Sequence, residues 1–403
     1  MKLFDVISVD KLNEQLTNFL ETAFTVTKKK LTDTFGYQLA EDIYAKEDTP
    51  AFYKSTMDGY AVMVQDTVGA SESLPSVLNY QGAIAIGENN LQTLDAGSCL
   101  YLNTGAMLPL GANAVVMIEQ TEKIEGSNDV LIYRSLAHHE NITVPGSDVA
   151  KGQPLFKKGQ LIDERVQATL ASQGITELKV FKKLEAVIIS SGNELVDHQS
   201  PTELGQVRDV NVFLIRGLLE KYGIHVKETF LIKDDVNTYR EQLEKSKADL
   251  YITSGGSSQG SEDYTYDVFH ELTGNVFCHG LAVSPGKPTI VAKKDQRLYL
   301  GLPGNPVSAY LVLRKTLIAS YLNLINQEGS AVKARLSHNI TGSPGKDRVV
   351  LVNLEKRSVG WSAQPIFYRS SSILALSKAD GYFVIKEGLE GMDEDVEVEV
   401  TLL

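Results

Sequence analysis

Residues 250–264 have the sequence LYITSGGSSQGSEDY, in which an apolar run meets a glycine-rich turn. The run Leu250 to Thr253 is typical of a buried strand, and a helix is expected from Tyr264 onward. Consecutive backbone N–H groups in such a turn, placed before a helix N-terminus, form an anion site that the helix dipole strengthens. The turn lacks the Lys-Ser/Thr ending of a Walker loop, which excludes that type of phosphate site.

The same alternation of strand and helix continues on both sides of this turn, from Leu184 to about Leu324. Strands are predicted at 186–190, 225–232, 250–253 and 298–302, and helices at 212–221, 236–246, 264–272 and 307–322. Apolar, β-branched strands that alternate with helices predict a parallel sheet covered on both faces, a three-layer α/β/α domain of about 140 residues. Ligands of such sheets bind at the carboxyl ends of the strands.

Two further turns follow predicted strands of this domain. Glu194 lies in the turn Ser190–Leu195, among small hydroxyl residues that let a ligand approach the backbone. The rigid turn Pro303-Gly304-Asn305-Pro306 precedes a helix that Pro306 can start, with Ser308 in its first turn. Either turn alone is equally consistent with a purely structural role, but several such turns on one sheet edge favour a ligand site.

Charged residues occur in other predicted turns. The stiff segment Ser284–Pro288 presents Lys287 as a point charge suited to an oxyanion. Asp263 ends the glycine-rich turn, where it either caps the helix or helps to hold a divalent cation between carboxylate and phosphate. Asp58, Thr104, Asp148 and the pair Asp234-Asp235 are further candidates, whose alternative roles are a plain turn, a helix cap or a solvated side chain. The histidines form no HxH or HExxH spacing, so no histidine-bound transition metal is expected.

The rest of the chain predicts helical and β regions. Ser8 is placed to cap an amphipathic opening helix, and Asp163 to cap a helix over Val166–Gln173. Short apolar runs broken by turn residues predict a mostly β insert before Pro145, and the tail after Ala331 returns to β character. The predicted domains are a discontinuous helical and linker domain (1–48 and 147–182), a β-rich insert (49–146), the α/β domain (183–328) and a C-terminal β domain (329–403).

Composition excludes several classes of protein. A formal charge of -12 and a pI near 5.2 argue against a broad nucleic-acid surface, because phosphate backbones require clustered Lys and Arg. The two cysteines, Cys99 and Cys278, have no zinc-type spacing. The N-terminus lacks the apolar core of a signal peptide, and no run of about 18 apolar residues occurs. We therefore expect a cytoplasmic protein without a membrane partner.

Several long motifs occur in order along the chain: SxMDGYA at 55–61, TGA-x2-P-x-GA-x-AVVM at 104–117, SGNEL at 191–195, Asp209 with Asn211, SGG-x-S-x-G-x2-DY at 254–264, PGKP at 285–288 and LPGNPVSA at 302–309. Together they resemble the molybdopterin molybdenumtransferase family, the bacterial proteins called MoeA and their relatives, the E domains of the plant molybdenum insertase and of gephyrin. The resemblance spans nearly the whole chain.

The resemblance implies an elongated homodimer in which another region of the dimer completes the site. It implies that adenylated molybdopterin and molybdate give molybdenum cofactor and AMP with Mg²⁺, between a molybdopterin adenylyltransferase upstream and molybdoenzyme maturation proteins downstream. By position, the implied catalytic residues are Asp58, Thr104, Asp148, Glu194, Asp235 and Asp263, of which Glu194, Asp235 and Asp263 would position Mg²⁺. The implied binding residues are Ser254, Gly255, Gly256, Ser258, Gly260, Pro303, Gly304, Asn305 and Pro306 for the phosphate-bearing pterin, and Lys287, Ser308, Arg348, Ser371 and Ser372 for molybdate.

The chain departs from the family pattern at a few positions: Tyr53-Lys54 for an Asp-Asn pair, Val210 for a hydroxyl residue, Ser257 for valine, and Ser284 for a lysine before PGKP. Loss of that lysine weakens the expected oxyanion site. Two alternatives to the transferase therefore remain, a catalytically weakened molybdopterin-binding or scaffold protein and a tungstate-preferring version. A competence-damage-related pyrophosphatase on the same α/β fold is disfavoured, because the first 180 residues and the β tail match the molybdenum family.

Overall fold

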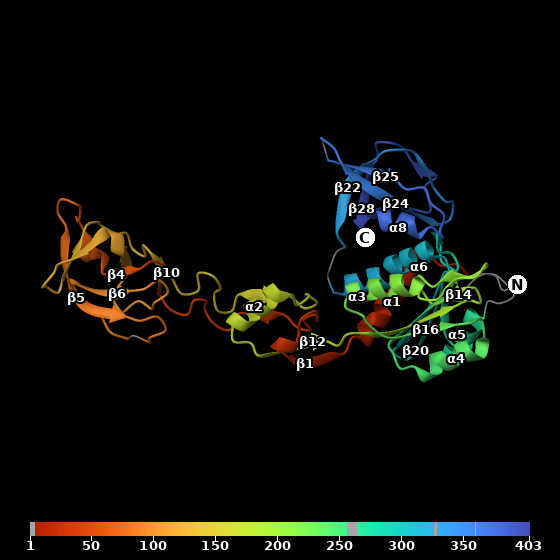
Figure 1. Cartoon of the computed structure of the whole chain (residues 1–403), viewed down its shortest axis with the longest axis horizontal. Helices are drawn as coiled ribbons and strands as arrows, with labels where there is room; N and C mark the ends of the chain where they lie inside the picture. The colour runs from red at the N-terminus through yellow and green to blue at the C-terminus, as the bar shows by residue number, and fades with distance from the viewer. Residues whose placement is uncertain (1–4, 90, 256–263, 326–328, 359) are drawn as a thin grey trace.

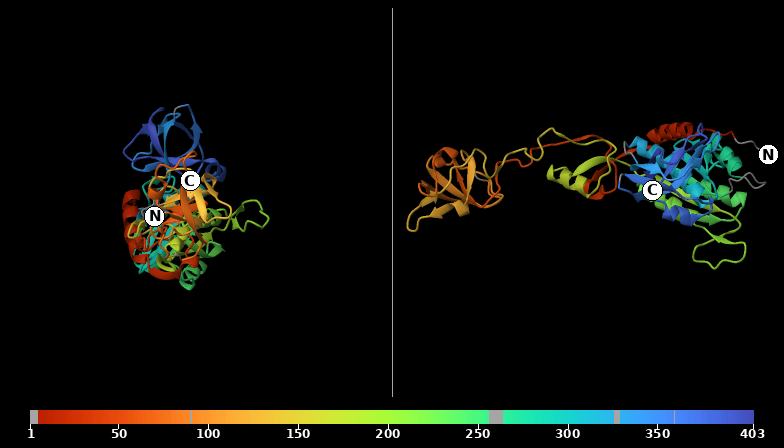
Figure 2. Two further views of the ribbon diagram at one scale, coloured as in Figure 1. Left: turned by 90° about the vertical axis from the view of Figure 1, so that its left-hand side faces the viewer. Right: turned by 90° about the horizontal axis from the view of Figure 1, so that it is seen from above.

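The computed structural model describes residues 5–89, 91–255, 264–325, 329–358 and 360–403. These residues form an elongated molecule (Figures 1 and 2). A β-rich region that contains β4 (Gly59–Val62) lies at one end. A region of α/β structure and a C-terminal β region lie at the other end, and a narrow connection with helix α2 (Glu164–Ser172) joins the two ends.

The α/β region is built on a six-stranded sheet of order β16-β13-β17-β21-β20-β18. Its strands are β13 (Glu185–Ser191), β16 (His225–Ile232), β17 (Leu250–Ser254), β18 (Val276–His279), β20 (Ile290–Lys294) and β21 (Arg297–Leu302). β16, β13, β17 and β21 are parallel, as predicted. The expectation of an all-parallel sheet is wrong, because β20 and β18 run antiparallel to their neighbours. Only two residues, with Asp295 at φ 52°, connect β20 to β21, and so short a connection requires a hairpin.

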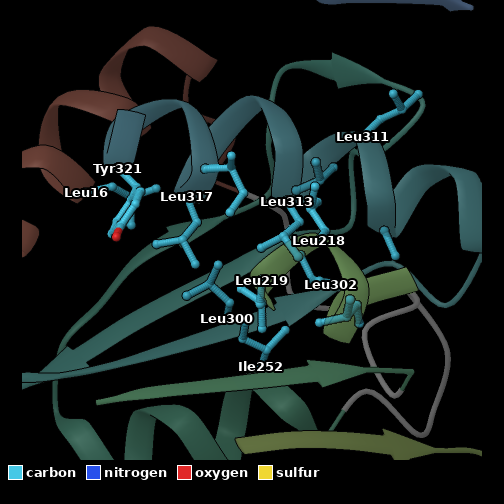
Figure 3. Close-up of a cluster of buried hydrophobic side chains, with 14 of the residues drawn as sticks. Leu16, Leu218, Leu219, Ile252, Leu300, Leu302, Leu311, Leu313, Leu317 and Tyr321 are labelled. Carbon is cyan, nitrogen blue, oxygen red and sulfur yellow. The ribbon is translucent and has the colours of Figure 1, made fainter. Parts of the chain in front are cut away.

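Helices cover both faces of this sheet and confirm the predicted α/β/α layers (Figure 1). They are α3 (Asn211–Lys221), α4 (Val236–Lys245), α5 (Thr265–Thr273), α6 (Pro306–Leu313), the π-helical turn η4 (Arg314–Ile318) and α7 (Ala319–Leu324). On one face, side chains such as Leu218, Leu313 and Leu317 pack over Ile252 and Leu300 of the sheet (Figure 3). On the other face, α4 and α5 bury Tyr239, Leu243 and Phe269. Burial of both faces explains the continuous apolar character of the strands.

The opening helix α1 (Val9–Ala23) begins where predicted, because Ser8 Oγ accepts a hydrogen bond from Lys11 N at 3.2 Å. Its apolar face, with Leu12, Leu16 and Leu20 fully buried, packs into the core of the α/β region beside α7. By sequence, this helix belongs to the predicted helical and linker domain (1–48 and 147–182). The structure instead places it on the α/β core, since its apolar stripe matches the surface of η4 and α7.

The connection between the two ends of the molecule contains small β elements and α2. These elements are β1 (Val26–Lys30) paired with β12 (Glu177–Phe181), β2 (Ile43–Tyr44) paired with β11 (Pro154–Phe156), and the 3-10 turn η1 (Leu31–Asp33). Asp163 caps α2 by accepting from the backbone N of Arg165 and Val166, which confirms the predicted cap. A small core around Leu39, Ile162 and Leu170 holds the connection together.

The β-rich region has a sheet of order β7-β4-β6-β5-β9-β8. Its other elements are β3 (Lys54–Ser55), β5 (Ser76–Ile84), β6 (Ser98–Leu102), β7 (Ala114–Met117), β8 (Thr121–Lys123), β9 (Asp129–Ile132), β10 (Ile142–Thr143), η2 (Val64–Thr67) and η3 (Ile118–Gln120). Two apolar clusters, one around Cys99 and one around Leu100, cover opposite faces of this sheet. The prediction of β structure in this part of the chain is confirmed.

The C-terminal region forms a sheet of order β19-β24-β25-β22-β28-β26, with an added pairing of β24 and β26. Its elements are β22 (Ala331–Leu336), β23 (Ile340–Thr341), β24 (Asp347–Lys356), β25 (Trp361–Pro365), β26 (Gly381–Ile385), β27 (Gly391–Met392), β28 (Glu397–Leu402) and α8 (Ile373–Lys378). The edge strand β19 (Val283–Ser284) comes from the α/β region and pairs Ser284 with Arg348. The two regions therefore share a sheet. Within the described ranges, none of the helices combines the length and apolar character that a membrane crossing requires.

Candidate functional site

A cavity of about 680 Å³ opens at the carboxyl ends of the parallel strands. Its lining residues come from the ends of β13, β16, β17 and β21 and the turns after them, and from the short strands β14 (Leu195–Val196) and β15 (Val207–Arg208). Others come from the start of α3, from Pro288 before β20, and from the start of α8 with the segment before it. The predicted site residues that line it are Glu194, Gly255, Pro303, Gly304, Asn305, Pro306 and Ser371. The strand-end turns of the α/β region thus meet at one sheet edge, as their order in the sequence predicts.

Gly255 lets the turn after β17 approach the turn after β13. Its φ is 98°, and a Cβ built there would lie 2.0 Å from the carbonyl oxygen of Ser191. Gly304, in the turn after β21, also lies close to Gly255. A Cβ built on Gly304 would be 3.9 Å from Gly255 Cα. Only glycine fits at Gly255, since any side chain would combine a left-handed backbone with a collision against backbone.

Asn211 joins two of these turns at the start of α3. Its Nδ2 donates to Ser254 Oγ at 2.5 Å and to Gly304 O at 2.8 Å. Asp209, two residues earlier, caps the same helix by accepting from Asn211 N at 3.0 Å and Val212 N at 3.3 Å. Asp209 and Asn211 are both largely buried. The pair therefore fixes the start of α3 and the distance between the turns after β17 and β21.

Asp234, after β16, anchors a hydrogen-bond network along the cavity. Tyr264 Oη lies 2.9 Å from Asp234 Oδ1 and 2.9 Å from Ser191 Oγ. The phenol has one hydrogen, which goes to the carboxylate as the stronger acceptor, so Ser191 donates to the phenol oxygen. Burial raises the pKa of Tyr264 above its usual value and keeps it a donor. Asp234 Oδ2 accepts from Asn193 N at 3.2 Å, which holds the turn that carries Glu194.

Of the predicted metal ligands, Glu194 is exposed and lines the cavity. Asp235 does not line it, because its carboxylate caps α4 by accepting from Thr238 N at 2.7 Å. Hydrogen bonds from the side chain of Thr238 and, to a smaller extent, from its backbone N lower the pKa of Asp235. Asp234 lies on the cavity instead. Asp263, with Gly256, Ser258 and Gly260 of the predicted phosphate turn, lies outside the described residues. Among the residues that the structure describes, no three His, Cys, Asp or Glu side chains form a ready metal cluster.

The residues predicted to bind molybdate lie in different parts of the structure. Ser371 reaches the main cavity, helped by the bond from Val307 N to Ser370 O at 3.1 Å. Lys287 is exposed, while Ser308 is 3% exposed and absent from the lining. Arg348 lines a second cavity of about 250 Å³ together with Ser284. Its guanidinium donates to the carbonyl and the hydroxyl of Thr341.

The remaining predicted residues lie at the far end of the molecule. Asp58 Oδ1 accepts from Thr104 N at 2.6 Å and from Thr104 Oγ1 at 2.9 Å. Both bonds lower the pKa of Asp58 below its usual value, and the bond from the backbone N of Thr104 has the larger effect. Asp148 is exposed near the connection, where its N donates to Thr49 O at 3.1 Å. The β-rich region that carries Asp58 and Thr104 is far from the cavity of the same chain (Figure 1).

Family models match the chain in three consecutive stretches. The MoeA N-terminal region (domain I and II) matches residues 7–174, a probable molybdopterin binding domain matches 187–322, and the MoeA C-terminal region (domain IV) matches 333–403. The chain belongs to the MoeA family. Members of this family that are similar to it include the molybdopterin molybdenumtransferase of Staphylococcus aureus, 31% identical over 391 residues, which are 94% of this chain and 91% of the relative.

The corresponding MoeA family protein of Staphylococcus epidermidis is 30% identical over 381 residues, covering 92% of this chain and 90% of the relative. A solved structure of the molybdopterin biosynthesis MoeA protein from Pyrococcus horikosii has a TM-score of 0.83 at 32% identity and covers 99% of both chains. The MoeA resemblance inferred from the motifs is therefore confirmed over the whole length of the chain.

Two residues at or beside the cavity of this MoeA family chain, Asn211 and Tyr264, were not among the predicted site residues, and Asp234 was a candidate only as one of the pair Asp234-Asp235. The signal for Asn211 was its position two residues after Asp209, directly before a predicted helix. Asp234 follows a predicted strand, as Glu194 does, but the sequence could not distinguish its role from that of Asp235. Tyr264 follows the glycine-rich turn, but its contact with β13 and β16 residues is tertiary.

Proposed function

We propose that the protein is a molybdopterin molybdenumtransferase, which inserts molybdate into adenylated molybdopterin and releases AMP. The observation that carries this proposal is the cavity of about 680 Å³ at the strand ends, which brings Gly255, Glu194 and the Pro303–Pro306 turn together. The names of the relatives in Staphylococcus support the same reaction. Gly255 and Gly304 line the cavity, and backbone N–H groups in such glycine-containing turns are a common binding site for phosphate.

The acidic residues of the cavity suit a divalent cation. Glu194 and Asp234 supply carboxylate oxygens, and Mg²⁺ is commonly bound by one or two carboxylates together with substrate phosphates. The residues present therefore fit Mg²⁺, with Asp263 as the remaining predicted ligand. When bound, Mg²⁺ would neutralise charge on the phosphoanhydride. Glu194 would also accept a proton from a water that attacks the phosphoanhydride, and the hydrogen bond from Tyr264 would keep Asp234 oriented.

We propose further that the working unit is a homodimer in which Asp58 and Thr104 of one protomer complete the cavity of the other. The support is geometric, because the β-rich region that carries these two residues lies at the opposite end of the elongated chain from the α/β region (Figure 2), which carries the cavity. In the cytoplasm, the enzyme would receive its substrate from a molybdopterin adenylyltransferase and pass its product to molybdoenzyme maturation proteins.

The test is AMP release from adenylated molybdopterin by the purified protein with molybdate and Mg²⁺. We expect molybdate-dependent release that Glu194→Ala or Asp263→Ala lowers at least about a hundredfold. Asn237→Ala, on the exposed surface of α4, is the control and should leave the rate unchanged. AMP output that neither acidic substitution alters would contradict these roles.

One observation favours a second candidate, a molybdopterin-binding protein with weak turnover. Ser284 stands beside Arg348 without a charge, and Thr341 already engages the Arg348 guanidinium. Ligand binding without molybdate-dependent AMP release would support this candidate. Restoring a charge with Ser284→Lys should then raise the rate of AMP release.

Parallel assays with tungstate in place of molybdate decide whether the enzyme prefers that oxyanion.

A further inference from the structure

The C-terminal region supplies part of the wall of the main cavity. Ser371 and Ile373, from the start of α8 and the residues before it, line the cavity together with the strand-end turns of the α/β region. Beside this wall, Val307 N donates to Ser370 O at 3.1 Å and attaches the segment to α6. The width of the cavity therefore depends on how the C-terminal region is placed against the α/β region.

Apolar side chains join the two regions over a broad contact. Val349, Leu351, Leu376 and Tyr382 of the C-terminal region pack into the core of the α/β region. Such burial stabilises the contact but has no preferred direction. The strand pairing between the regions, β19 with β24, consists of two residue pairs. Neither the apolar contact nor so short a pairing prevents the C-terminal region from rotating.

Asp347 adds a directional contact at this pairing. Asp347 is the first residue of β24, and its N donates to Ala282 O at 3.0 Å. Its carboxylate lies 3.3 Å from Lys315 Nζ of η4, and both side chains are largely buried. Lys386, which contacts the same carboxylate, is exposed. The buried Lys315 ammonium is compensated only while the carboxylate stays within reach, so the pair favours one arrangement of the two regions.

We propose that Asp347 is a positioning residue, which holds the C-terminal region in the orientation that places Ser371 and Ile373 at the cavity. Its ion pair with Lys315 makes the short strand pairing a fixed joint. The part of this inference that concerns substrate binding rests on the proposed function. A buried ion pair often adds little net stability compared with a well-packed apolar pair, but in some proteins it specifies one arrangement. The two roles can therefore be separated by experiment.

Two variants make this separation. Asp347→Asn leaves the Lys315 ammonium buried without a counter-charge. The double variant Lys315→Met with Asp347→Leu replaces the pair by an apolar contact and should regain stability. If the pair only stabilised the fold, the double variant would behave like the wild type. If the pair positions the C-terminal region, both variants lose the fixed orientation.

The orientation is measured by electron paramagnetic resonance, with spin labels on Lys356→Cys and Asn237→Cys of the full chain. Both labelled positions are exposed, and the native Cys99 and Cys278 are buried. Lys356 ends β24, about 30 Å from Asp347 along an extended strand, so a small rotation at Asp347 moves this label far. We expect one narrow distance without further substitution, and a distribution at least about twofold wider in both variants.

Kinetics test the consequence at the cavity. AMP release is measured with adenylated molybdopterin, molybdate and Mg²⁺ at a temperature at which all variants are folded. We expect the KM for adenylated molybdopterin to rise about tenfold in both variants while kcat stays within about twofold, because the displaced wall loses binding contacts. Leu170→Ala is the control, since it lowers stability through the separate core of the connection. It should keep both the narrow distance and the KM.

Unchanged distance distributions in both variants would overturn the inference, whatever the activity. A double variant that regains the narrow distance and the wild-type KM would show a purely stabilising pair and overturn it as well, even if Asp347→Asn fails to fold. A wider distribution with an unchanged KM would contradict the role at the cavity. If the wild-type chain releases no AMP, the proposed function fails, and the distances alone decide whether Asp347 fixes the orientation.

Discussion

At the scale of single residues, the shape of the cavity depends on positions where the backbones of two segments lie in direct contact. Gly255 is the clearest, because its φ of 98° and its approach to Ser191 O both require the absence of a side chain. Gly205 offers a comparison, since its φ is 90° but a Cβ there would meet nothing within 4 Å. The two glycines therefore separate the cost of a left-handed backbone from the cost of a collision.

We expect Gly205→Ala to lower the free energy of unfolding by about 1 kcal/mol, the cost of the left-handed conformation. Gly255→Ala adds a collision with backbone and should lose at least about 2 kcal/mol more. Urea unfolding of the two variants, followed by tyrosine fluorescence and circular dichroism, measures the difference. Equal losses would show that the turn after β13 moves away freely.

Thr104 determines the ionisation of Asp58. The pKa of Asp58 is lowered by the backbone and hydroxyl bonds of Thr104. Because the folded pKa lies below the unfolded one, the stabilisation is complete above the usual pKa of an aspartate and is lost as the pH falls through the lowered value. We expect Thr104→Val to raise the pKa of Asp58 part of the way back, since the backbone bond remains. Carbon-13 NMR titration of the carboxyl group, with Thr104→Ser as the control, checks this shift.

At the scale of elements, one ion pair joins the C-terminal sheet to the α/β region. Lys315, in η4, lies 3.3 Å from Asp347 Oδ2 at the start of β24, and their side chains are 10% and 7% exposed. Lys386 contacts the same carboxylate at 3.4 Å and also Asp10 of α1. Burial lowers the pKa of Lys315, and Asp347 opposes that effect. Two lysines that are distant in sequence thus share one carboxylate, and Lys386 extends the contact to Asp10 of α1.

We expect Asp347→Asn to destabilise the protein by about 3 kcal/mol, because it leaves the Lys315 ammonium buried without a counter-charge. The double variant Lys315→Met with Asp347→Leu should recover most of this loss. Glu271→Gln is the control, since it breaks the exposed pair with Arg240 and should cost less than about 1 kcal/mol. Thermal unfolding followed by calorimetry distinguishes these outcomes.

The packing of α1 makes a second prediction at this scale. Leu16 is fully buried between α1 and the α/β core (Figure 3). Leu16→Ala should therefore cost about 2–5 kcal/mol through lost burial and the cavity left behind. Leu204 is fully exposed, and Leu204→Ala should change stability by less than about 0.5 kcal/mol. If Leu16→Ala were as mild as the control in urea unfolding, α1 would not be part of this core.

At the scale of the whole molecule, the proposed dimer predicts complementation between two inactive variants. In a mixed dimer of Asp58→Ala and Glu194→Ala protomers, one site holds both wild-type residues and the other holds neither. Random reassociation should restore about a quarter of the wild-type rate of AMP release, because half of the dimers are mixed. Asp58→Ala mixed with Thr104→Ala should restore nothing, since both changes affect the same side of each site. No recovery in the first mixture would contradict a shared site.

Much of the α/β region was predictable because its strands and helices each carry a clear period. The runs at 186–190 and 250–253 are continuously apolar, and Ser8 and Asp163 mark helix starts by their chemistry. The strands β18 and β20 were missed, because β20 ends in Lys293 and Lys294 and is followed by a charged turn. In the site, the sequence indicated Glu194 and Gly255 but could not distinguish Asp234 from its neighbour Asp235.

The sequence by itself determined that turns rich in glycine, proline and acidic residues follow consecutive parallel strands, since local propensity and period decide where strands end. Only the tertiary structure decided that Asn211 connects two of those turns, that α1 packs on α7, and that Arg348 stands in a second cavity beside Ser284. Contacts of this kind join residues far apart in the chain. They depend on how whole elements pack, and no local pattern records them.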